Sequence, residues 1–305
     1  GGTKVEVGVQ TTYERINREM HRGHGIQASL DANRRLRDAA FKVGFHMMPG
    51  QPGMSKEMCL QDFRELFESS DWRPDYLKIY PTLVVRDTVT YDMWRKGEYD
   101  PLTNEAAAEL VAEIKSMIPR YTRLQRVQRD IPADFIDAGV WKSNLRQLAR
   151  KRMDDHDWTC DCIRCREVGM NDESPDNVEL DVLTYEAAGG TEHFISVEDF
   201  EKDLLVGFCR LRFPNDPVRA ELDDAALVRE LHVYGSQVGV GDEAGADDDH
   251  QHRGYGRQLL ERAERLSEKA GYGKLSIISG IGARQYYRKK LGYYQDGPYV
   301  SKRLR

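Results

Sequence analysis

The first half of the chain switches between the two-residue period of a strand and the longer period of a helix. The pattern predicts strands at 4–10, 42–48, 76–80 and 122–128, and helices at 12–22, 26–41, 56–68 and 104–118. Strands and helices in alternation form parallel sheets, whose strands are usually buried on both faces. Four strands do not close a barrel, and no helix precedes the first one. We therefore expect part of a (β/α) barrel, N-terminally truncated.

Polar residues mark the ends of these strands, where barrels carry their active sites. Gln10 ends the first strand, His46 lies within the second, and Lys78 and Tyr80 belong to the third. These four residues are the candidate site of the barrel. For His46 alone, a hydrogen-bonded core histidine is the simpler alternative.

The second half changes to an antiparallel pattern from about residue 177. Strands are expected at 178–185, at 204–212 with Cys209 in the core, and at 226–234. They are followed by a helix at 255–270 and a strand at 274–279. The chain then forms a short helix through Tyr286 and Tyr287 and a last strand from Tyr293. The chain is thus expected to be α/β, with a partial barrel in 1–135, a linker in 136–170 and an α+β domain in 171–305.

A glycine-rich segment opens the long helix of this half, at Gln251-x-x-Gly254-x-Gly256-Arg257. Glycines let the backbone approach a phosphate closely, and the first N–H groups of a helix donate to an anion. No Gly-Lys-Ser/Thr follows, so the segment is not a P-loop, and the flanking pattern does not fit a dinucleotide-binding unit. An ordinary turn into a helix is the alternative.

This segment resembles the Gln/Arg-x-x-Gly-x-Gly/Ala motif of the GNAT acetyltransferase superfamily. The resemblance implies that acetyl-CoA binds here, and that a tyrosine lies near the thioester sulfur. The residues implied for acetyl-CoA are Glu230, Leu231, His232 and Val233 in the preceding strand, Gln251, Gly254, Tyr255, Gly256 and Arg257 at the helix, and Tyr287. The catalytic tyrosine is Tyr287 or Tyr286, and counting from Arg284 favours Tyr287.

Charge is distributed unevenly. The chain has 305 residues, with 45 Lys+Arg and 51 Asp+Glu, yet the stretch from Lys115 to Arg152 holds ten basic and three acidic residues. Such a field attracts polyanions, although a solvated helix face laced with ion pairs is the alternative. The candidate RNA-binding residues are Arg126, Arg129, Arg146, Arg150, Lys151 and Arg152. No apolar run approaches the ~20 residues of a membrane span, so we expect a cytoplasmic protein without membrane contact.

Three of the five cysteines form a Cys160-x-Cys162-x2-Cys165 cluster. Thiolates at this spacing can converge on one soft ion, and zinc prefers four nitrogen or sulfur ligands. His156 is the first choice for the fourth ligand, which otherwise stays unknown. An iron–sulfur cluster and three buried thiols are the alternatives.

Several longer stretches resemble the family of Elongator catalytic subunits. They are Glu6–Gln10, Arg22–His24, His46–Pro49, Lys78–Leu83, Arg126–Pro132, Arg229–Ser236 and Gly297–Tyr299. The resemblance covers essentially the whole chain. It implies a radical S-adenosylmethionine (SAM) barrel joined to an acetyltransferase domain, and modification of the wobble uridine of tRNA at carbon 5. It also implies tRNA and other Elongator subunits as partners, a homodimer, and acetyl-CoA, SAM and a [4Fe–4S] cluster as cosubstrates and cofactors of the full-length protein.

The chain departs from that family at two points. The C-x9-C-x2-C motif that holds the family's cluster is absent, so residues 1–305 are not expected to hold it. One extra residue separates Tyr287 from Gly292. Two rival functions remain: a protein lysine acetyltransferase with Glu230 as general base, and a tRNA-binding protein without radical activity. The basic segment favours an RNA substrate over a cationic lysine tail.

Overall fold

The computed structural model describes residues 1–127, 131–234 and 254–304, and the chain divides into two compact units. The parallel-sheet unit comprises Glu6–Ala32 and Val43–Cys162, and the mixed-sheet unit comprises Gly1–Val5, Asn33–Lys42 and Ile163–Arg305. Residues 33–42 therefore pack with a part of the chain far downstream. Within the described ranges, no helix combines the length and the apolar character that a membrane crossing requires.

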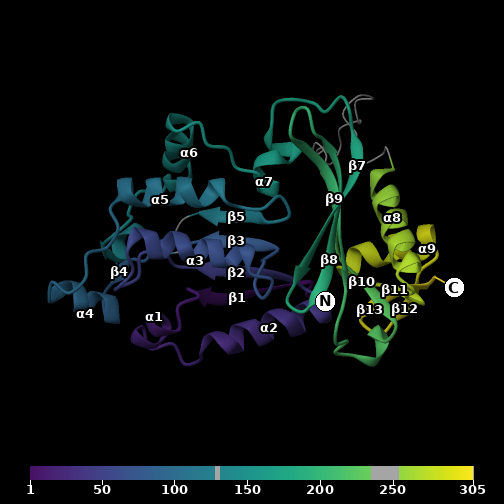
Figure 1. The fold of residues 1–305 in the computed structure, drawn as a ribbon, viewed down its shortest axis with the longest axis horizontal. Helices are drawn as coiled ribbons and strands as arrows, with labels where there is room; N and C mark the ends of the chain where they lie inside the picture. Colours follow the sequence, from purple (N-terminus) through teal and green to yellow (C-terminus); the bar gives the residue numbers. More distant parts are fainter. Residues whose placement is uncertain (128–130, 235–253, 305) are drawn as a thin grey trace. The chain divides into compact units, whose positions relative to one another are not determined.

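A four-stranded sheet forms the centre of the parallel-sheet unit, and Figure 1 shows its strands side by side in the order β1-β2-β3-β5. They are β1 (Lys4–Gln10), β2 (Lys42–Met47), β3 (Tyr76–Ile79) and β5 (Arg123–Val127). The pairs β2–β3 and β3–β5 are parallel. The carboxyl ends of the paired strands consequently lie at one edge of the sheet.

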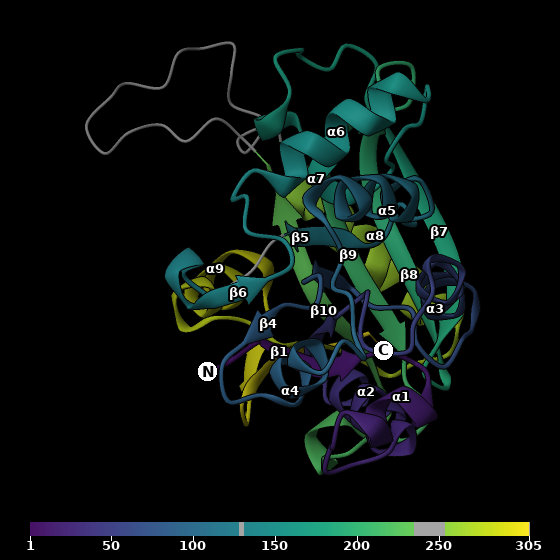
Figure 2. The ribbon, with the colours of Figure 1, turned by 90° about the vertical axis from the view of Figure 1, so that its left-hand side faces the viewer.

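Helices connect these strands: α1 (Glu14–Glu19), α2 (Ile26–Asp38), α3 (Lys56–Glu68), α4 (Val89–Arg95) and α5 (Asn104–Ser116), with α6 (Leu145–Asp155) after β5. Ser55 caps α3 by accepting from the Met58 N–H, and Thr103 caps α5 by accepting from the Ala106 N–H. Strand β4 (Val84–Val85) pairs antiparallel with β6 (Ile136–Ala138), as Figure 2 shows, and β6 directly follows a 3-10 turn at Ala133–Phe135.

The mixed-sheet unit holds a seven-stranded sheet in the order β12-β13-β11-β10-β9-β8-β7. Its strands are β7 (Glu179–Ala187), β8 (Gly190–Asp199), β9 (Leu204–Phe213), β10 (Ala225–Val233), β11 (Lys274–Ile277), β12 (Tyr294–Asp296) and β13 (Tyr299–Arg303). All neighbours are antiparallel except β10 and β11. The short helix α7 (Ile163–Arg166) and 3-10 turns at Val168–Met170, Ala220–Leu222 and Ile281–Ala283 complete the unit.

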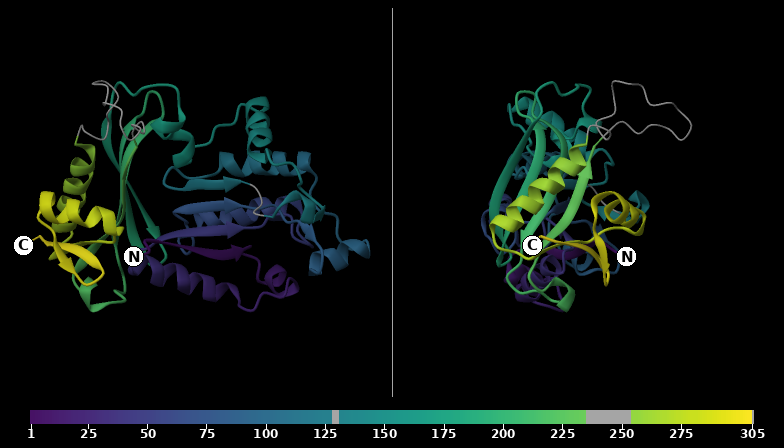
Figure 3. Two further views of the ribbon diagram at one scale, coloured as in Figure 1. Left: turned by 180° about the vertical axis from the view of Figure 1, so that it is seen from behind. Right: turned by 90° about the vertical axis from the view of Figure 1, so that its right-hand side faces the viewer.

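The two faces of this sheet bury different partners. Helix α8 (Tyr255–Lys269) lies across one face, as the right-hand view of Figure 3 shows, and α9 (Arg284–Leu291) packs on the same core. That core takes Ala226 and Val228 from β10, whereas the alternate residues Ala225 and Leu227 contact Ala40 on the opposite face. Because successive side chains of β10 point to opposite faces of the sheet, the strand contributes residues to two separate apolar layers.

The expected fold class is observed, and most predicted elements lie within a few residues of their expected bounds. The sequence reasoning missed β4, α4, β6, α6, α7 and β8. It was also wrong about a single final strand from Tyr293, because Gly297, at φ +57°, turns the chain between β12 and β13. Strand β8 escaped detection because charged residues such as Glu192 and Glu198 occupy buried positions in it.

Candidate functional site

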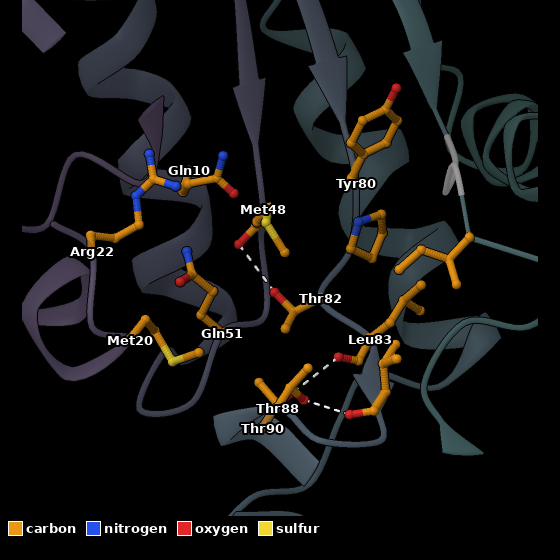
Figure 4. A pocket seen from close by; sticks show the side chains of 13 residues that line it. Gln10, Met20, Arg22, Met48, Gln51, Tyr80, Thr82, Leu83, Thr88 and Thr90 are labelled. Atoms are coloured by element: carbon orange, nitrogen blue, oxygen red, sulfur yellow. Dashed lines mark hydrogen bonds between the residues drawn. The ribbon is translucent and has the colours of Figure 1, made fainter. Parts of the chain in front are cut away.

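A pocket of about 460 Å³ opens at the carboxyl ends of the parallel strands (Figure 4). Gln10 ends β1, Met48 follows β2, and Tyr80 follows β3, and all three line the pocket. Gln10 adopts a φ of +68°, a conformation that residues other than glycine rarely take. The edge of the sheet expected to carry chemistry therefore does carry a cavity.

The four residues predicted for this site separate into two pairs. Gln10 and Tyr80 line the pocket, whereas His46 and Lys78 do not. His46 Nε2 lies 2.8 Å from Glu6 Oε2, and Lys78 Nζ donates to the same carboxylate at 2.6 Å. His46 and Lys78 are thus held by one acidic residue of β1, and His46 matches the simpler explanation of a hydrogen-bonded structural histidine.

Arg22 and Gln51 are polar residues of the pocket that were not predicted as site residues. Arg22 lies beside Gln10 in Figure 4 and donates to the carbonyl of Gly8. Gln51 is only 4% exposed, and its Nε2 has no hydrogen-bond partner in the described part of the chain. A buried amide without partners costs about 1–3 kcal/mol, so its retention beside a cavity suits ligand binding. Of these, only Arg22 belonged to a stretch that the family resemblance had already marked.

A gap between two strands defines a second site, in the mixed-sheet unit. Strands β10 and β11 pair from Ala225↔Lys274 to Val228↔Ile277, and a last bond joins the Ile278 N–H to the Val228 carbonyl at 3.2 Å. Beyond it β10 continues to Val233 along β9 alone, after a bulge between Val228 and Glu230. Within the described residues, no strand pairs with this edge of β10, which includes the predicted Leu231, His232 and Val233. The edge is open to an extended ligand with amide groups.

The first turn of α8 lies next to the end of this open edge. Gly254, at φ +77°, begins the helix, and a Cβ on Gly256 would lie 3.6 Å from Cγ2 of Val233. Among the described residues, no carbonyl accepts from the N–H groups of Tyr255 and Gly256. The Arg257 N–H instead donates to the Gly254 carbonyl at 3.0 Å, so the first two N–H groups of the helix, and not that of Arg257, are the ones without an acceptor among the described residues. Gln251 lies outside the described residues.

Glu230 of β10 forms a buried ion pair. Its Oε2 accepts from Arg210 Nε at 2.9 Å, and the two side chains are 7% and 1% exposed. The guanidinium of Arg210 lies over the rings of Phe194 and Phe208. This geometry supports the structural role of Glu230 over the general-base role that a lysine acetyltransferase would need.

The two candidate tyrosines differ in their surroundings. Tyr287 is 6% exposed and lies in the α8 core, and burial raises the pKa of its phenol above the ordinary value. Tyr286 is 44% exposed, and the two rings meet edge to face at 5.6 Å. No described residue hydrogen-bonds the Tyr287 hydroxyl. A protonated phenol of this kind can serve as a general acid toward a bound ligand.

Comparison with known proteins now gives these sites a context. Residues 74–155 match the Radical_SAM C-terminal domain, and residues 156–293 match the Acetyltransferase (GNAT) family. The solved structure of Methanocaldococcus infernus Elp3 with an N-terminal deletion is 44% identical, with a TM-score of 0.93; the match covers 99% of this chain and 72% of that one. This chain belongs to the Elongator protein 3 family.

Curated members of the Elongator protein 3 family are similar along the whole chain. The tRNA uridine(34) acetyltransferase of Methanocaldococcus jannaschii is 46% identical, and Elongator complex protein 3 of Saccharomyces cerevisiae is 44% identical; each match covers 100% of this chain. The chain spans 57% and 56% of the lengths of these two relatives. The parallel-sheet pocket thus lies largely in the radical SAM part of the family, and the open edge of β10 lies in the acetyltransferase part.

The cysteine cluster is compact in this Elongator protein 3 chain. The Sγ atoms of Cys160, Cys162 and Cys165 lie within 4.8 Å of one another, and no described histidine or carboxylate joins them. His156 is not brought to the cluster, because its Nε2 lies 3.2 Å from Glu109 Oε1 and its ring stacks on Trp158. Three convergent thiols can hold a soft metal ion, with the fourth position open.

The basic segment is partly neutralised. Arg150 pairs with Asp154 at 3.0 Å, and Arg152 lies 3.9 Å from Glu109, so α6 carries the ion pairs of a solvated face. Arg146 donates to the Leu124 carbonyl at 3.2 Å. The remaining predicted RNA-binding residues are Arg126 and Lys151, which are exposed, and Arg129, which lies outside the described residues. Fewer basic side chains of this segment are therefore available to bind RNA than the sequence alone suggested.

Proposed function

We propose that this chain binds acetyl-CoA at the open edge of β10 and takes part in modifying uridine 34 of tRNA. The observation that carries this proposal is the adjacency of that edge to the first turn of α8. Pantetheine presents amide groups that can pair with an unpaired strand edge, and the pyrophosphate can accept from the N–H groups of Tyr255 and Gly256. The relative from Methanocaldococcus jannaschii is a tRNA uridine(34) acetyltransferase, which supports uridine 34 of tRNA as the target.

Tyr287 completes the proposed acetyl-transfer site. In acetyl-CoA hydrolysis, water adds to the thioester carbonyl carbon, the carbon–sulfur bond breaks and acetate leaves. The electron pair of the broken bond stays on the CoA sulfur, and a proton must reach it. The phenol of Tyr287 is protonated at neutral pH, because a tyrosine pKa is ordinarily about 10 and burial raises it further. It therefore holds a proton beside the proposed site. We keep Tyr286 as the alternative donor, since it is adjacent and exposed.

The radical part of the proposal is more limited. Radical SAM relatives imply SAM and a [4Fe–4S] cluster, and the pocket with Gln10, Arg22 and Gln51 offers amide and guanidinium donors that suit a polar organic ligand such as SAM. The thiols present do not fit the cluster motif, so we derive no radical step from this chain. We further propose that the cysteine cluster binds zinc and that the protein acts in the cytoplasm, as a homodimer and with other Elongator subunits. The proposed domains are 1–135, 136–170 and 171–305.

Calorimetric titration with acetyl-CoA tests the proposed site. Gly256→Glu places a carboxylate beside the two free N–H groups, and the affinity should fall more than about tenfold, or at least ~1.4 kcal/mol. Gly256→Ala is the matched control, because its Cβ meets Val233 at an ordinary 3.6 Å. Unchanged binding by folded Gly256→Glu would overturn the site. The rate of acetyl-CoA hydrolysis should also be measured with and without tRNA. A rate that tRNA does not increase would contradict tRNA as the substrate.

A protein lysine acetyltransferase is the weaker alternative. That reaction needs a base to remove a proton from the lysine ammonium, and Glu230 was the candidate. Its buried pairing with Arg210 speaks against that role. Acetylation of a lysine peptide at a rate that Glu230→Gln abolishes would revive the alternative.

A further inference from the structure

The mixed-sheet unit has a cavity of about 480 Å³ where β10 and β11 separate. Ile278 and Ser279, which follow β11, line it together with Tyr299 of β13. Tyr299 and Ile278 belong to the apolar layer around Ala225 and Leu227, which is the face of the sheet opposite α8. The cavity therefore lies on the side of the sheet opposite α8.

Three arginines and no carboxylates line this cavity, which we call the arginine pocket: Arg35, Arg219 and Arg284. Arg219 is neutralised by Glu221, with Nη2 at 2.8 Å from the carboxylate. In the described part of the chain, Arg35 and Arg284 have no acidic partner, and Arg284 Nη2 donates to the Pro298 carbonyl at 2.9 Å. Among the described residues, the pocket thus has two guanidinium groups without a carboxylate partner.

Two buried donors of the arginine pocket lack acceptors. Ser279 is 7% exposed, and its Oγ has no hydrogen-bond partner among the described residues. The Nε of Arg284 is likewise buried without a partner. Buried polar groups are nearly always paired, so these atoms are a sign of an absent acceptor. A hydroxyl and a guanidinium together match the oxygens of a phosphate.

Phosphate could come from RNA or from CoA. The proposed CoA pyrophosphate site is the first turn of α8, which belongs to the other face of the sheet. The second substrate must reach the acetyl group from the remaining face, and the proposed second substrate is a polyanion. Resting on the proposed function, we propose that the arginine pocket binds a backbone phosphate of tRNA through Arg35, Arg284 and Ser279, next to the acetyl site.

Filter binding of tRNA to the whole chain at several salt concentrations tests this assignment. The double variant Arg35→Gln/Arg284→Gln should bind tRNA about tenfold more weakly, and its log–log salt slope should be smaller by about 0.7–0.9. The matched control Arg265→Gln/Lys269→Gln removes two charges from the exposed end of α8 and should bind like the parent. Arg35→Lys/Arg284→Lys should restore the salt slope more than the affinity, since lysine keeps the charge but loses the guanidinium geometry.

Each outcome decides the point. If the parent and Arg35→Gln/Arg284→Gln bind tRNA equally well, the arginine pocket is not a phosphate site for tRNA, and the proposed function still stands. A loss of acetyl-CoA affinity in that variant, with tRNA binding unchanged, would assign the phosphate to CoA. A parent that fails to bind tRNA would overturn the proposed function and this inference together. Ser279→Ala gives a second readout, because it should weaken tRNA binding without changing the charge.

Discussion

Replacing Glu192 by glutamine should destabilise the mixed-sheet unit strongly. Glu192 is 1% exposed, and its carboxylate accepts from three fully buried arginines. The distances are 3.1 Å from Arg37 Nη1, 3.0 Å from Arg212 Nη1, and 3.2 and 2.8 Å from Arg229 Nε and Nη2. Asp38 provides the second carboxylate of the network, at 2.7 Å from Arg212.

The magnitude follows from the charge that remains. Among the ion pairs named above, Glu192 and Asp38 supply the carboxylates that face the buried arginines, and Glu192→Gln removes one of these two negative charges. Removing one partner from a buried ion pair costs about 3–5 kcal/mol, because the other charge stays buried without compensation. Arg212 keeps Asp38, and the glutamine carbonyl still accepts one hydrogen bond. We therefore expect a loss of about 3 kcal/mol in the free energy of unfolding.

Urea unfolding followed by circular dichroism and tryptophan fluorescence measures this loss. The matched control is Glu261→Gln, because Glu261 pairs with Arg257 at 2.8 Å on the exposed surface of α8. That variant should unfold nearly like the parent, since exposed pairs contribute little. A loss below about 1 kcal/mol in Glu192→Gln would refute the reasoning, because it would mean that the buried guanidiniums do not need the Glu192 charge.

Three further predictions concern metal, pH and RNA. Elemental analysis should find about one zinc per chain, lost with thermal stability in Cys162→Ser; metal-free parent protein would contradict a zinc site at the three thiols. Burial lowers the pKa of His193 below its ordinary 6.5, so the unfolded chain takes up the proton first, and stability should fall as the pH drops below about 6.5. His193→Gln should flatten this dependence, and identical pH profiles would contradict it. Changing Arg150, Lys151 and Arg152 to Glu should weaken tRNA binding and its salt dependence while acetyl-CoA binding survives; parent-like tRNA binding would make α6 a plain solvated face.

Local sequence was sufficient for the elements that carry a clear period or cap. The range predicted for β1 and that for α3 match the observed bounds, Lys4–Gln10 and Lys56–Glu68, because strand alternation and the Ser55 cap act within a few residues. The glycine motif predicted the start of α8 for the same reason. Gln10 and Tyr80 could be placed in a strand-end pocket because parallel strands always present their carboxyl ends at one edge.

Tertiary structure alone decided which charges are buried and which partners they meet. Asp38 and Arg212 are far apart in the chain yet lie 2.7 Å apart, and nothing local to either residue indicates that pairing. Likewise, β8 was not predicted as a strand, because Glu192 can be buried only when Arg212 and Arg229 of other strands neutralise it. The arginine pocket unites Arg35 with Ser279 and Arg284 in the same way. Short-range patterns determine secondary structure, whereas the energy of a buried charge depends on groups that only folding brings within hydrogen-bonding distance.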